Sequence, residues 1–499
     1  MATNSTGLQP SQGAGEENNQ LPSARTAPNL DAVQALASTM LRCVECLTLY
    51  PAIEAGQAML PIPRYRCDCG GVLDVEILLK HPDSHERQVH DASFFDSDTN
   101  VLPATGASWR QLFDERISSS PIWAISTDKH LLDASGVWRY RELILPVPEQ
   151  YVITRPEGNT ALYPVGMENC SVGRVGHRQI GIYAGLDRFF LKHEGENPTG
   201  SFKDRGMTVG VTMAHVMGAK AVACASTGNT SASLASYAAQ AGMRGIVFLP
   251  AGNVAGGKLA QTLAYGATTV QIEGDFDDAM RLVEQVCNEL GIYLLNSLNP
   301  FRVEGQKAIG FEILQQLDWQ APDWLVLPAG NLGNTSAIGK AFRQAYQLGL
   351  ISHMPRIASI QAEGANPFHR SFMGKFAKRF SVQAETIASA IKIGNPVSYT
   401  RARRVIEESD GIVTSVSDTQ ILAAKTVIDR SGIGCEPASA ATLAGIRQLV
   451  EGGVIKHDER VVGILTGTIL KDSKTGMPQG VSGIVVKPTI DAVKNVLSQ

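Results

Sequence analysis

The feature that most constrains the fold is a regular alternation of strand and helix patterns after Val175. Short apolar, β-branched runs predict strands at 221–225, 245–249, 268–272, 324–327, 357–361, 413–416 and 461–465. Helical patterns lie between them at 230–241, 258–265, 277–290, 418–430 and 438–451. Strands that alternate with helices in this way form parallel sheets covered on both faces. The sequence therefore predicts an α/β fold without internal repeats.

Length and charge narrow the class of protein. A chain of 499 residues can form two or three domains, each with its own core. The formal net charge of -4 predicts no nucleic-acid partner, and no apolar run is long enough to predict a membrane span. The N-terminus lacks the basic head and apolar core of a secretory signal, so we expect a cytoplasmic protein.

The first 150 residues differ from the rest. Residues 1–30 are rich in Asn, Ser, Gly, Gln and Pro, which predicts a disordered tail. Residues 31–150 show few clean patterns and are expected to form an irregular N-terminal extension. This extension holds a cysteine cluster, Cys43-Val-Glu-Cys46 followed by Cys67-Asp-Cys69. Four thiolates could close a structural zinc site, although the second spacing is tighter than usual. The alternative is a vestigial ribbon that binds no metal, and the sequence leaves both open.

The most informative segment is Asn197-Pro-Thr-Gly-Ser-Phe-Lys203-Asp-Arg. Pro198 and Gly200 predict a tight turn that aims the amine of Lys203. A lysine in a part-buried pocket has a lowered pKa, and its neutral amine can attack an aldehyde. The alternative for any single lysine is an exposed side chain in solvent.

Further segments follow predicted strands. Ser226-Thr-Gly-Asn-Thr-Ser231 opens a helix, where backbone amides favour an anion such as a carboxylate, although simple helix capping is also expected. Gly330-Asn-Leu-Gly-Asn334 suits a phosphate but lacks the lysine of an ATP-binding loop, and similar sequences occur in ordinary turns. Another segment of this kind is Leu465-Thr-Gly-Thr-Ile-Leu-Lys-Asp472.

In this order the segments resemble those of fold-type-II pyridoxal-phosphate enzymes, and most closely the threonine synthase family, over roughly residues 115–485. The resemblance implies two open, twisted, mainly parallel sheets with flanking helices. It implies that Lys203 carries the cofactor as a Schiff base. The other cofactor contacts it implies are Asn229 to the ring hydroxyl, Thr466 to the pyridine nitrogen, and Gly330, Asn331, Leu332, Gly333 and Asn334 to the phosphate. The chain departs from the family pattern at Ile469, where glycine is usual.

The resemblance also implies a substrate site. Ser226, Thr227 and Thr230 would bind the substrate carboxylate, and Lys258, Asn296, Ser297 and Arg302 a second phosphate. The alternative for Lys258 and Arg302 is an exposed position on a helix. The implied reaction is γ-elimination of phosphate from O-phospho-L-homoserine and β-addition of water, giving L-threonine. Threonine dehydratase and cysteate synthase remain the alternatives.

Two domains and a dimer are expected. Residues 151–215 and 320–499 are predicted to form a large cofactor-binding domain, and residues 216–319 a small mobile α/β domain. Dimers are common in this fold, so a homodimer is expected.

Overall fold

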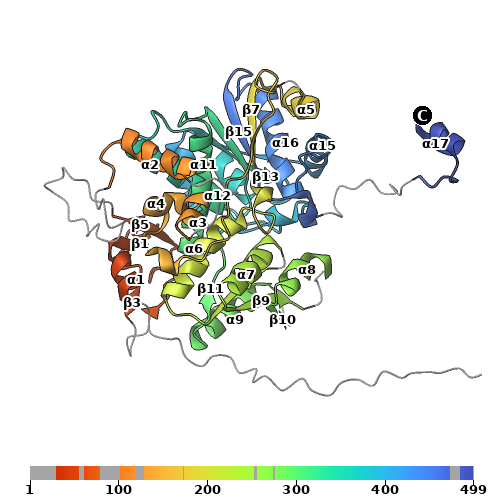
Figure 1. Ribbon diagram of the computed structural model, residues 1–499. Coiled ribbons are helices and arrows are strands. Elements are labelled where there is room, and N and C mark those ends of the chain that lie inside the picture. The colour runs from red at the N-terminus through yellow and green to blue at the C-terminus, as the bar shows by residue number, and fades with distance from the viewer. Residues whose placement is uncertain are drawn as a thin grey trace, which may run out of the picture.

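The structure is a computed structural model that describes residues 30–55, 61–78, 102–119, 128–171, 173–226, 228–251, 256–273, 276–472 and 484–497. Apart from Leu30, the predicted disordered tail lies outside the described residues. Two mainly parallel sheets and their helices form the body of the molecule (Figure 1).

The larger sheet has six strands. Their order is β14 (Ile412–Val416), β13 (Arg356–Ala362), β12 (Trp324–Pro328), β15 (Arg460–Leu465), β7 (Arg188–His193) and β6 (Leu162–Pro164). All neighbours are parallel except β6, which pairs antiparallel with β7. Alternate residues of β12 enter different cores: Trp324 and Val326 face α5 (Val175–Ala184), α15 (Asp418–Arg430) and α16 (Pro437–Glu451), whereas Leu325 and Leu327 join the core on the other side. A strand buried on both faces reads as a continuous apolar run, as the sequence shows here.

The smaller sheet has four parallel strands. Their order is β10 (Thr268–Ile272), β9 (Arg244–Pro250), β8 (Ala221–Ala225) and β11 (Tyr293–Leu294), with helices α7 (Asn229–Gln240), α8 (Gly256–Ala264) and α9 (Phe276–Glu289). Every predicted strand in both sheets is confirmed, with ends that agree to within one residue. Strands β6 and β7 of the larger sheet and the two-residue strand β11 of the smaller sheet were not predicted.

The N-terminal extension contains a small sheet of its own. Strands β2 (Leu49–Pro51), β1 (Thr39–Cys43) and β5 (Leu73–Ile77) pair antiparallel, and β3 (Glu54–Ala55) pairs with β4 (Pro61–Ile62). Helices α1 (Leu30–Ala35), α2 (Gly106–Ser119), α3 (Asp128–Ala134) and α4 (Arg141–Ile144) complete this part. Side chains such as Trp109 and Phe113 of α2 belong to the main core, so the extension is packed on the body.

Helices α6 (Lys203–Val216), α10 (Pro300–Gln306), α11 (Ala308–Gln316) and α12 (Gly333–Gln347) lie against the inner side of the larger sheet. Helices α6 and α10 pack closely because Gly206 has no side chain, and a Cβ there would lie 2.6 Å from the carbonyl oxygen of Arg302. The remaining helices are α13 (Pro367–Met373), α14 (Tyr399–Glu408) and α17 (Ile490–Leu497). In Figure 1, α17 lies apart from the body.

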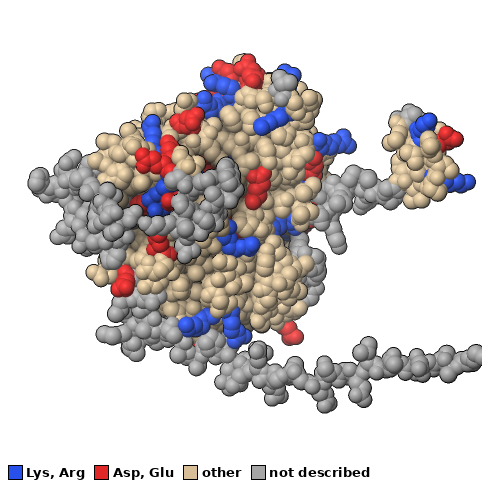
Figure 2. All heavy atoms as spheres, viewed as in Figure 1, with Lys and Arg blue, Asp and Glu red and all other residues tan. Residues whose placement is uncertain are grey.

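The surface carries both signs of charge. On the face in Figure 2, Lys and Arg are interspersed with Asp and Glu among larger uncharged areas, without an extended basic patch. Within the described part of the chain, no helix has the length and apolar character needed to cross a membrane.

Candidate active site

The predicted site segments meet at the carboxyl ends of the parallel strands. In the larger sheet, Lys203 follows β7, Thr466 follows β15 and the loop 330–334 follows β12, and these three strands are direct neighbours. In the smaller sheet, the loop 226–230 follows β8 and the segment 296–302 follows β11. Ligands of open α/β sheets bind at this edge.

The loop before Lys203 is fixed to the segment that contains Thr466. Phe202 N donates to Thr466 O at 3.0 Å, and Thr468 N donates to Gly200 O at 3.0 Å. Ser201 and Gly467 therefore form an antiparallel bridge. Gly200 has φ of +87°, a conformation that favours glycine, so the tight turn predicted before the lysine is present.

Lys203 begins helix α6, and its amine lies 3.8 Å from the centroid of the Phe202 ring. Burial is the main cause that lowers the pKa of Lys203 to about 7, and the positive charge of Arg302 acts in the same direction. The carboxyl group of Glu436 opposes both. Near neutral pH a large fraction of this amine is therefore unprotonated and able to act as a nucleophile or a base.

Arg302 is a buried cation that pairs with no carboxylate of the described residues. Its side chain is 2% exposed, and its Nη1 donates to the Leu295 carbonyl at 2.9 Å. Its Nε has no hydrogen-bond partner, and among the described residues no Asp or Glu forms an ion pair with it. Burial lowers the pKa of Arg302 to about 10. A buried charge without a partner is costly, and this guanidinium is therefore suited to a bound anion. The alternative of an exposed helix position is wrong for Arg302.

Glu436, at the start of α16, is a site residue that sequence reasoning missed. Its carboxyl group accepts hydrogen bonds from Asn229 Nδ2 at 3.0 Å and from Thr466 Oγ1 at 2.9 Å. It thereby joins the two side chains predicted to contact the cofactor ring. Burial raises the pKa of Glu436, although both hydrogen bonds oppose this. The available signal was a charged residue directly before Pro437 in an otherwise apolar helix start.

The loop 330–334 has the form expected of a backbone cradle. Leu332 has φ of +64° immediately before α12 begins at Gly333. A Cβ at Gly330 would lie 2.9 Å from Ile391 Cα, so only glycine fits there without displacement. Asn334 Oδ1 is buried and has no hydrogen-bond partner among the described residues. Open amides at a helix start and an unsatisfied polar atom fit a polar ligand at this position.

Several predicted substrate contacts lie close to the cofactor loops. Asn331 Nδ2 donates to Ser297 Oγ at 3.0 Å, which joins the predicted cofactor-phosphate loop to the predicted substrate-phosphate segment. Asn296 Oδ1 accepts from Ala225 N at 2.9 Å, directly before Ser226. The residue that caps helix α7 is Gly228, which has no side chain, so among the described residues the expected capping by Ser or Thr is not found.

The other predicted substrate-binding residues make fewer contacts or are only partly described by the structure. Ser226 and Thr230 are partly exposed at the site edge, and Ser226 Oγ accepts from Gly228 N at 3.3 Å. Thr227 and the side chain of Lys258 lie outside the described residues. Ile469 opens a short 3₁₀ helix with an ordinary negative φ, so the departure from the family glycine costs no backbone strain.

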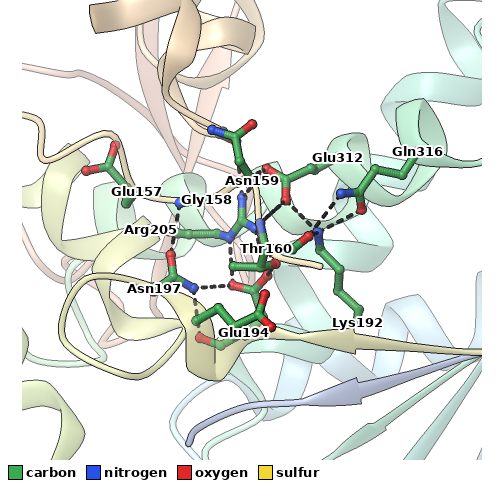
Figure 3. Close-up of polar contacts among 12 residues, drawn as sticks. Glu157, Gly158, Asn159, Thr160, Lys192, Glu194, Asn197, Arg205, Glu312 and Gln316 are labelled. Carbon is green, nitrogen blue, oxygen red and sulfur yellow. Dashed lines mark hydrogen bonds and ion pairs between the residues drawn. The ribbon is translucent and has the colours of Figure 1, made fainter. Parts of the chain in front are cut away.

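A buried ion network supports the lysine segment (Figure 3). Arg205 donates to Glu194 at 2.6 and 2.7 Å and to Glu312 at 2.8 and 3.0 Å, and Lys192 donates to Glu312 at 2.5 Å. Burial opposes ionisation, yet Arg205 and Lys192 hold the pKa of Glu312 well below its usual range. Asn197, at the start of the lysine segment, donates to Glu194 at 2.9 Å. The network therefore fixes the turn from which Lys203 extends.

Asp204, the residue after Lys203, fixes the same turn from the other side. It accepts hydrogen bonds from Thr199 N at 2.7 Å, from Thr199 Oγ1 at 2.6 Å and from Ser233 Oγ at 2.5 Å. Burial raises the pKa of Asp204 to about 6 despite these hydrogen bonds. Because Ser233 belongs to α7, Asp204 connects the lysine loop to the helix that follows the predicted carboxylate-binding loop.

The four N-terminal cysteines also come together. The sulfur atoms of Cys43, Cys46, Cys67 and Cys69 all lie within 4.8 Å of one another, and none is in a disulfide. The Cys43–Cys69 and Cys46–Cys67 sulfur separations are 3.5 and 3.4 Å. Zinc–sulfur bonds of about 2.3 Å in a tetrahedron require sulfur separations of about 3.8 Å. The tight Cys-x-Cys spacing is therefore compatible with a four-thiolate site.

Comparisons with known proteins agree with this geometry. A family model described as "Pyridoxal-phosphate dependent enzyme" matches residues 177–467. The threonine synthase of Methanosarcina acetivorans is 49% identical over 375 residues, covering 75% of this chain and 89% of that protein. The threonine synthase of Methanocaldococcus jannaschii is 39% identical over 460 residues, covering 92% of this chain and 99% of that protein.

Solved structures show the same fold at low identity. The processed form of threonine deaminase isoform 2 from Solanum lycopersicum superposes with a TM-score of 0.52 at 19% identity, covering 77% of this chain and 95% of that one. Maize serine racemase has a TM-score of 0.52 at 20% identity, covering 62% of this chain and 88% of that one. Fold and family model together define a fold-type-II pyridoxal-phosphate-dependent enzyme. Within that class, the chain belongs to the threonine synthase family.

Proposed function

We propose that this chain forms L-threonine and inorganic phosphate from O-phospho-L-homoserine and water, with Lys203 as the cofactor-bearing lysine. Family membership supports the reaction. The site assignment rests mainly on Arg302. This buried cation pairs with no carboxylate among the described residues, and its charge lowers the pKa of Lys203. A site with a second anion besides the cofactor phosphate needs such a group.

The residues at the strand ends fit pyridoxal phosphate. The loop 330–334 would hold its phosphate, Asn229 and Thr466 would contact its ring, and Lys203 would bind its aldehyde carbon. Support comes from the buried, unpartnered oxygen of Asn334 and from the alignment of Asn229 and Thr466 by Glu436. When bound, this cofactor withdraws electrons and stabilises negative charge on the substrate carbons.

The chain's own groups bind the substrate and move protons. Ser226, Thr227 and Thr230 would bind its carboxylate, and Lys258, Asn296, Ser297 and Arg302 its phosphate. Lys203, with a pKa of about 7, takes the proton from the α-carbon and can return protons to neighbouring carbons. The β-carbon also gives up a proton to a base of the site, its C–H electron pair forms the β–γ double bond, and the phosphate leaves with the electron pair of the γ-carbon–oxygen bond while Arg302 stabilises its charge. Water then supplies the hydroxyl group of the β-carbon.

Phosphate release tests this proposal. The purified enzyme with O-phospho-L-homoserine should yield equal amounts of phosphate and threonine, and Arg302→Ala should lose most of this activity. Threonine dehydratase would instead form a keto acid from threonine, and cysteate synthase would consume phosphoserine. No threonine from O-phospho-L-homoserine, together with either of these activities, would contradict the proposal.

For the cysteine cluster we propose a structural zinc ion held by Cys43, Cys46, Cys67 and Cys69. The sulfur geometry supports this, and four thiolate ligands leave no open position for catalysis. Elemental analysis of protein produced with adequate zinc should find one zinc ion per chain. A metal-free protein that cannot be loaded with zinc under reducing conditions would exclude the site.

We also propose a two-domain organisation, a homodimer and a cytoplasmic location. We propose a small mobile domain at 216–319 and a larger domain at 151–215 and 320–499, and the division is supported by the separate four-stranded and six-stranded sheets. Sedimentation analysis would test the homodimer, and cell fractionation the cytoplasmic location.

A further inference from the structure

The cysteine cluster belongs to a module that contacts the predicted substrate-phosphate segment directly and is connected to the predicted cofactor-phosphate loop through helix α14. The cysteine module, residues 39–55 and 61–78, consists of the β2-β1-β5 sheet and the two turns that carry the cysteines. In the first turn Cys43 N donates to Thr48 O at 2.9 Å, and in the second Cys67 N donates to Gly71 O at 2.9 Å. The Cys43–Cys69 and Cys46–Cys67 contacts cross from one turn to the other, so an ion among the sulfurs would cross-link the turns.

One side of the module binds helix α14. Thr400 Oγ1 donates to Glu45 Oε1 at 2.6 Å, between the first two cysteines. Arg401 lies 2.7 Å from Asp74 and also donates to the carbonyl of Leu73. One turn further on, Arg404 donates to the carbonyl of Val44 at 3.2 Å. The start of α14 is therefore held by residues that flank the cysteines.

The start of α14 in turn holds the predicted cofactor-phosphate loop. Val397 N donates to Asn331 Oδ1 at 3.0 Å, and Ser398 N donates to Asn331 O at 3.2 Å. Asn331 donates to Ser297, as described above. A short chain of contacts therefore leads from the cysteines through α14 to Asn331 and then to Ser297.

A second set of contacts reaches the predicted substrate-phosphate segment directly. Val44 and Val72 form a small apolar cluster with Leu298, which lies between Ser297 and Arg302. Val44 stands between Cys43 and Cys46, and Val72 follows the turn that contains Cys67 and Cys69. Val44 N also donates to Val72 O at 3.1 Å. The two cysteine turns therefore present the side chains that pack against this segment.

We infer that the metal-loaded cysteine module positions both phosphate-binding segments, so that metal occupancy sets the affinity of the enzyme for its cofactor and for its phosphorylated substrate. The inference rests on the proposed function and on the proposed zinc site. The metal acts at a distance, by fixing Val44 and Val72 against Leu298 and Glu45 against α14. It should therefore change binding far more than the turnover of fully bound enzyme.

The test compares the zinc-loaded holoenzyme with Cys46→Ser. Cys46 is exposed, so its substitution should spare the fold, and Cys170→Ser is the matched control because Cys170 lies outside the cluster. Zinc content, the Kd for pyridoxal phosphate, and KM and kcat for O-phospho-L-homoserine are measured for each. Cys46→Ser should lose zinc and raise both Kd and KM at least about tenfold, which corresponds to about 1.4 kcal/mol, with little change in kcat. Loss of zinc without a change in Kd or KM would overturn the inference.

A second variant examines the connection without altering a cysteine. Arg401→Lys removes the fixed fork that contacts both Asp74 and Leu73. This variant should keep its zinc and still raise the Kd for pyridoxal phosphate, and an unchanged Kd would overturn the route through α14. If zinc-loaded wild type forms no threonine, the proposed function fails, while the dependence of the cofactor Kd on zinc still decides the inference.

Discussion

Two fully buried arginines on adjoining helices differ in their partners. Arg205 of α6 binds two carboxylates, Glu194 and Glu312, which raise its pKa well above the usual value against the effect of burial. Arg302 of α10 pairs with no carboxylate in the part of the chain that the structure describes, and burial lowers its pKa to about 10. Among the described residues the first charge is neutralised by carboxylates, whereas the second is not, which is why we propose that it binds an anion. The paired arginine therefore belongs to the ion network that maintains the fold, whereas the unpaired one lies in the proposed ligand site.

Lys203→Ala should have the largest effect, because it removes the reactive amine beside Arg302. Threonine formation should fall by at least about 10²- to 10⁴-fold, the usual contribution of a proton-transferring side chain. The visible absorption band of the lysine-bound cofactor should disappear as well. The exposed Lys456→Ala is the control. A variant that kept both the band and the activity would show that Lys203 is not the cofactor lysine.

Arg205→Met should mainly lower stability, because it leaves Glu194 and Glu312 buried and short of a partner. Removing one member of a buried ion pair typically costs about 3–5 kcal/mol. Urea unfolding would measure this loss. Arg447→Met, which breaks an exposed pair with Glu451, should cost no more than about 1 kcal/mol. Equal effects of the two substitutions would contradict the structural role of the network.

In contrast to Arg205→Met, Arg302→Met should weaken substrate binding without lowering stability. The free energy of unfolding of the cofactor-free protein should stay the same or rise, because a buried charge without a partner is removed. The KM for O-phospho-L-homoserine should rise by an amount that corresponds to about 1.5–3 kcal/mol, the usual contribution of a hydrogen bond to a charged group. Steady-state kinetics and urea unfolding test both expectations. A large loss of stability without a change in KM would place Arg302 among the structural charges.

The smallest expected effect is on the pH dependence of cofactor capture. Only the neutral amine of Lys203 attacks an aldehyde, so capture of pyridoxal phosphate by the cofactor-free enzyme should accelerate as pH rises and level off above pH about 7. In Arg302→Met the midpoint should move to higher pH, because one cause of the lowered pKa is removed. Stopped-flow absorbance follows the reaction. A midpoint near the ordinary lysine pKa in the wild type would contradict the burial of this amine.

Much of the fold was predictable because strand and helix patterns are local. Strands such as β12 and β15 read as apolar runs, and the ends of the seven predicted strands agree to within one residue, whereas the central strand β7 was not predicted. The small N-terminal sheet was not predicted, because its short strands depend on antiparallel pairing across two turns. Local sequence patterns do not predict such pairings.

The site was predictable only in part, for a similar reason. Lys203 and the loops after the strands stand in recognisable segments, whereas Glu436 is distant in sequence from both Asn229 and Thr466. Its role depends on a carboxyl group that happens to lie between them in three dimensions. Likewise, nothing in the sequence around Arg302 shows that the surrounding protein supplies no carboxylate. Burial and pairing are properties of the folded chain.

The bridge between Ser201 and Gly467 has a consequence for how this enzyme can vary. Because backbone hydrogen bonds join the lysine loop directly to the Thr466 segment, the spacing between these two contacts is independent of the length of chain that connects them. Insertions or deletions in surface loops anywhere between the two segments should leave that spacing unchanged. The smaller sheet and the loops that follow its strands can therefore be remodelled, by evolution or by design, without moving Lys203 relative to Thr466.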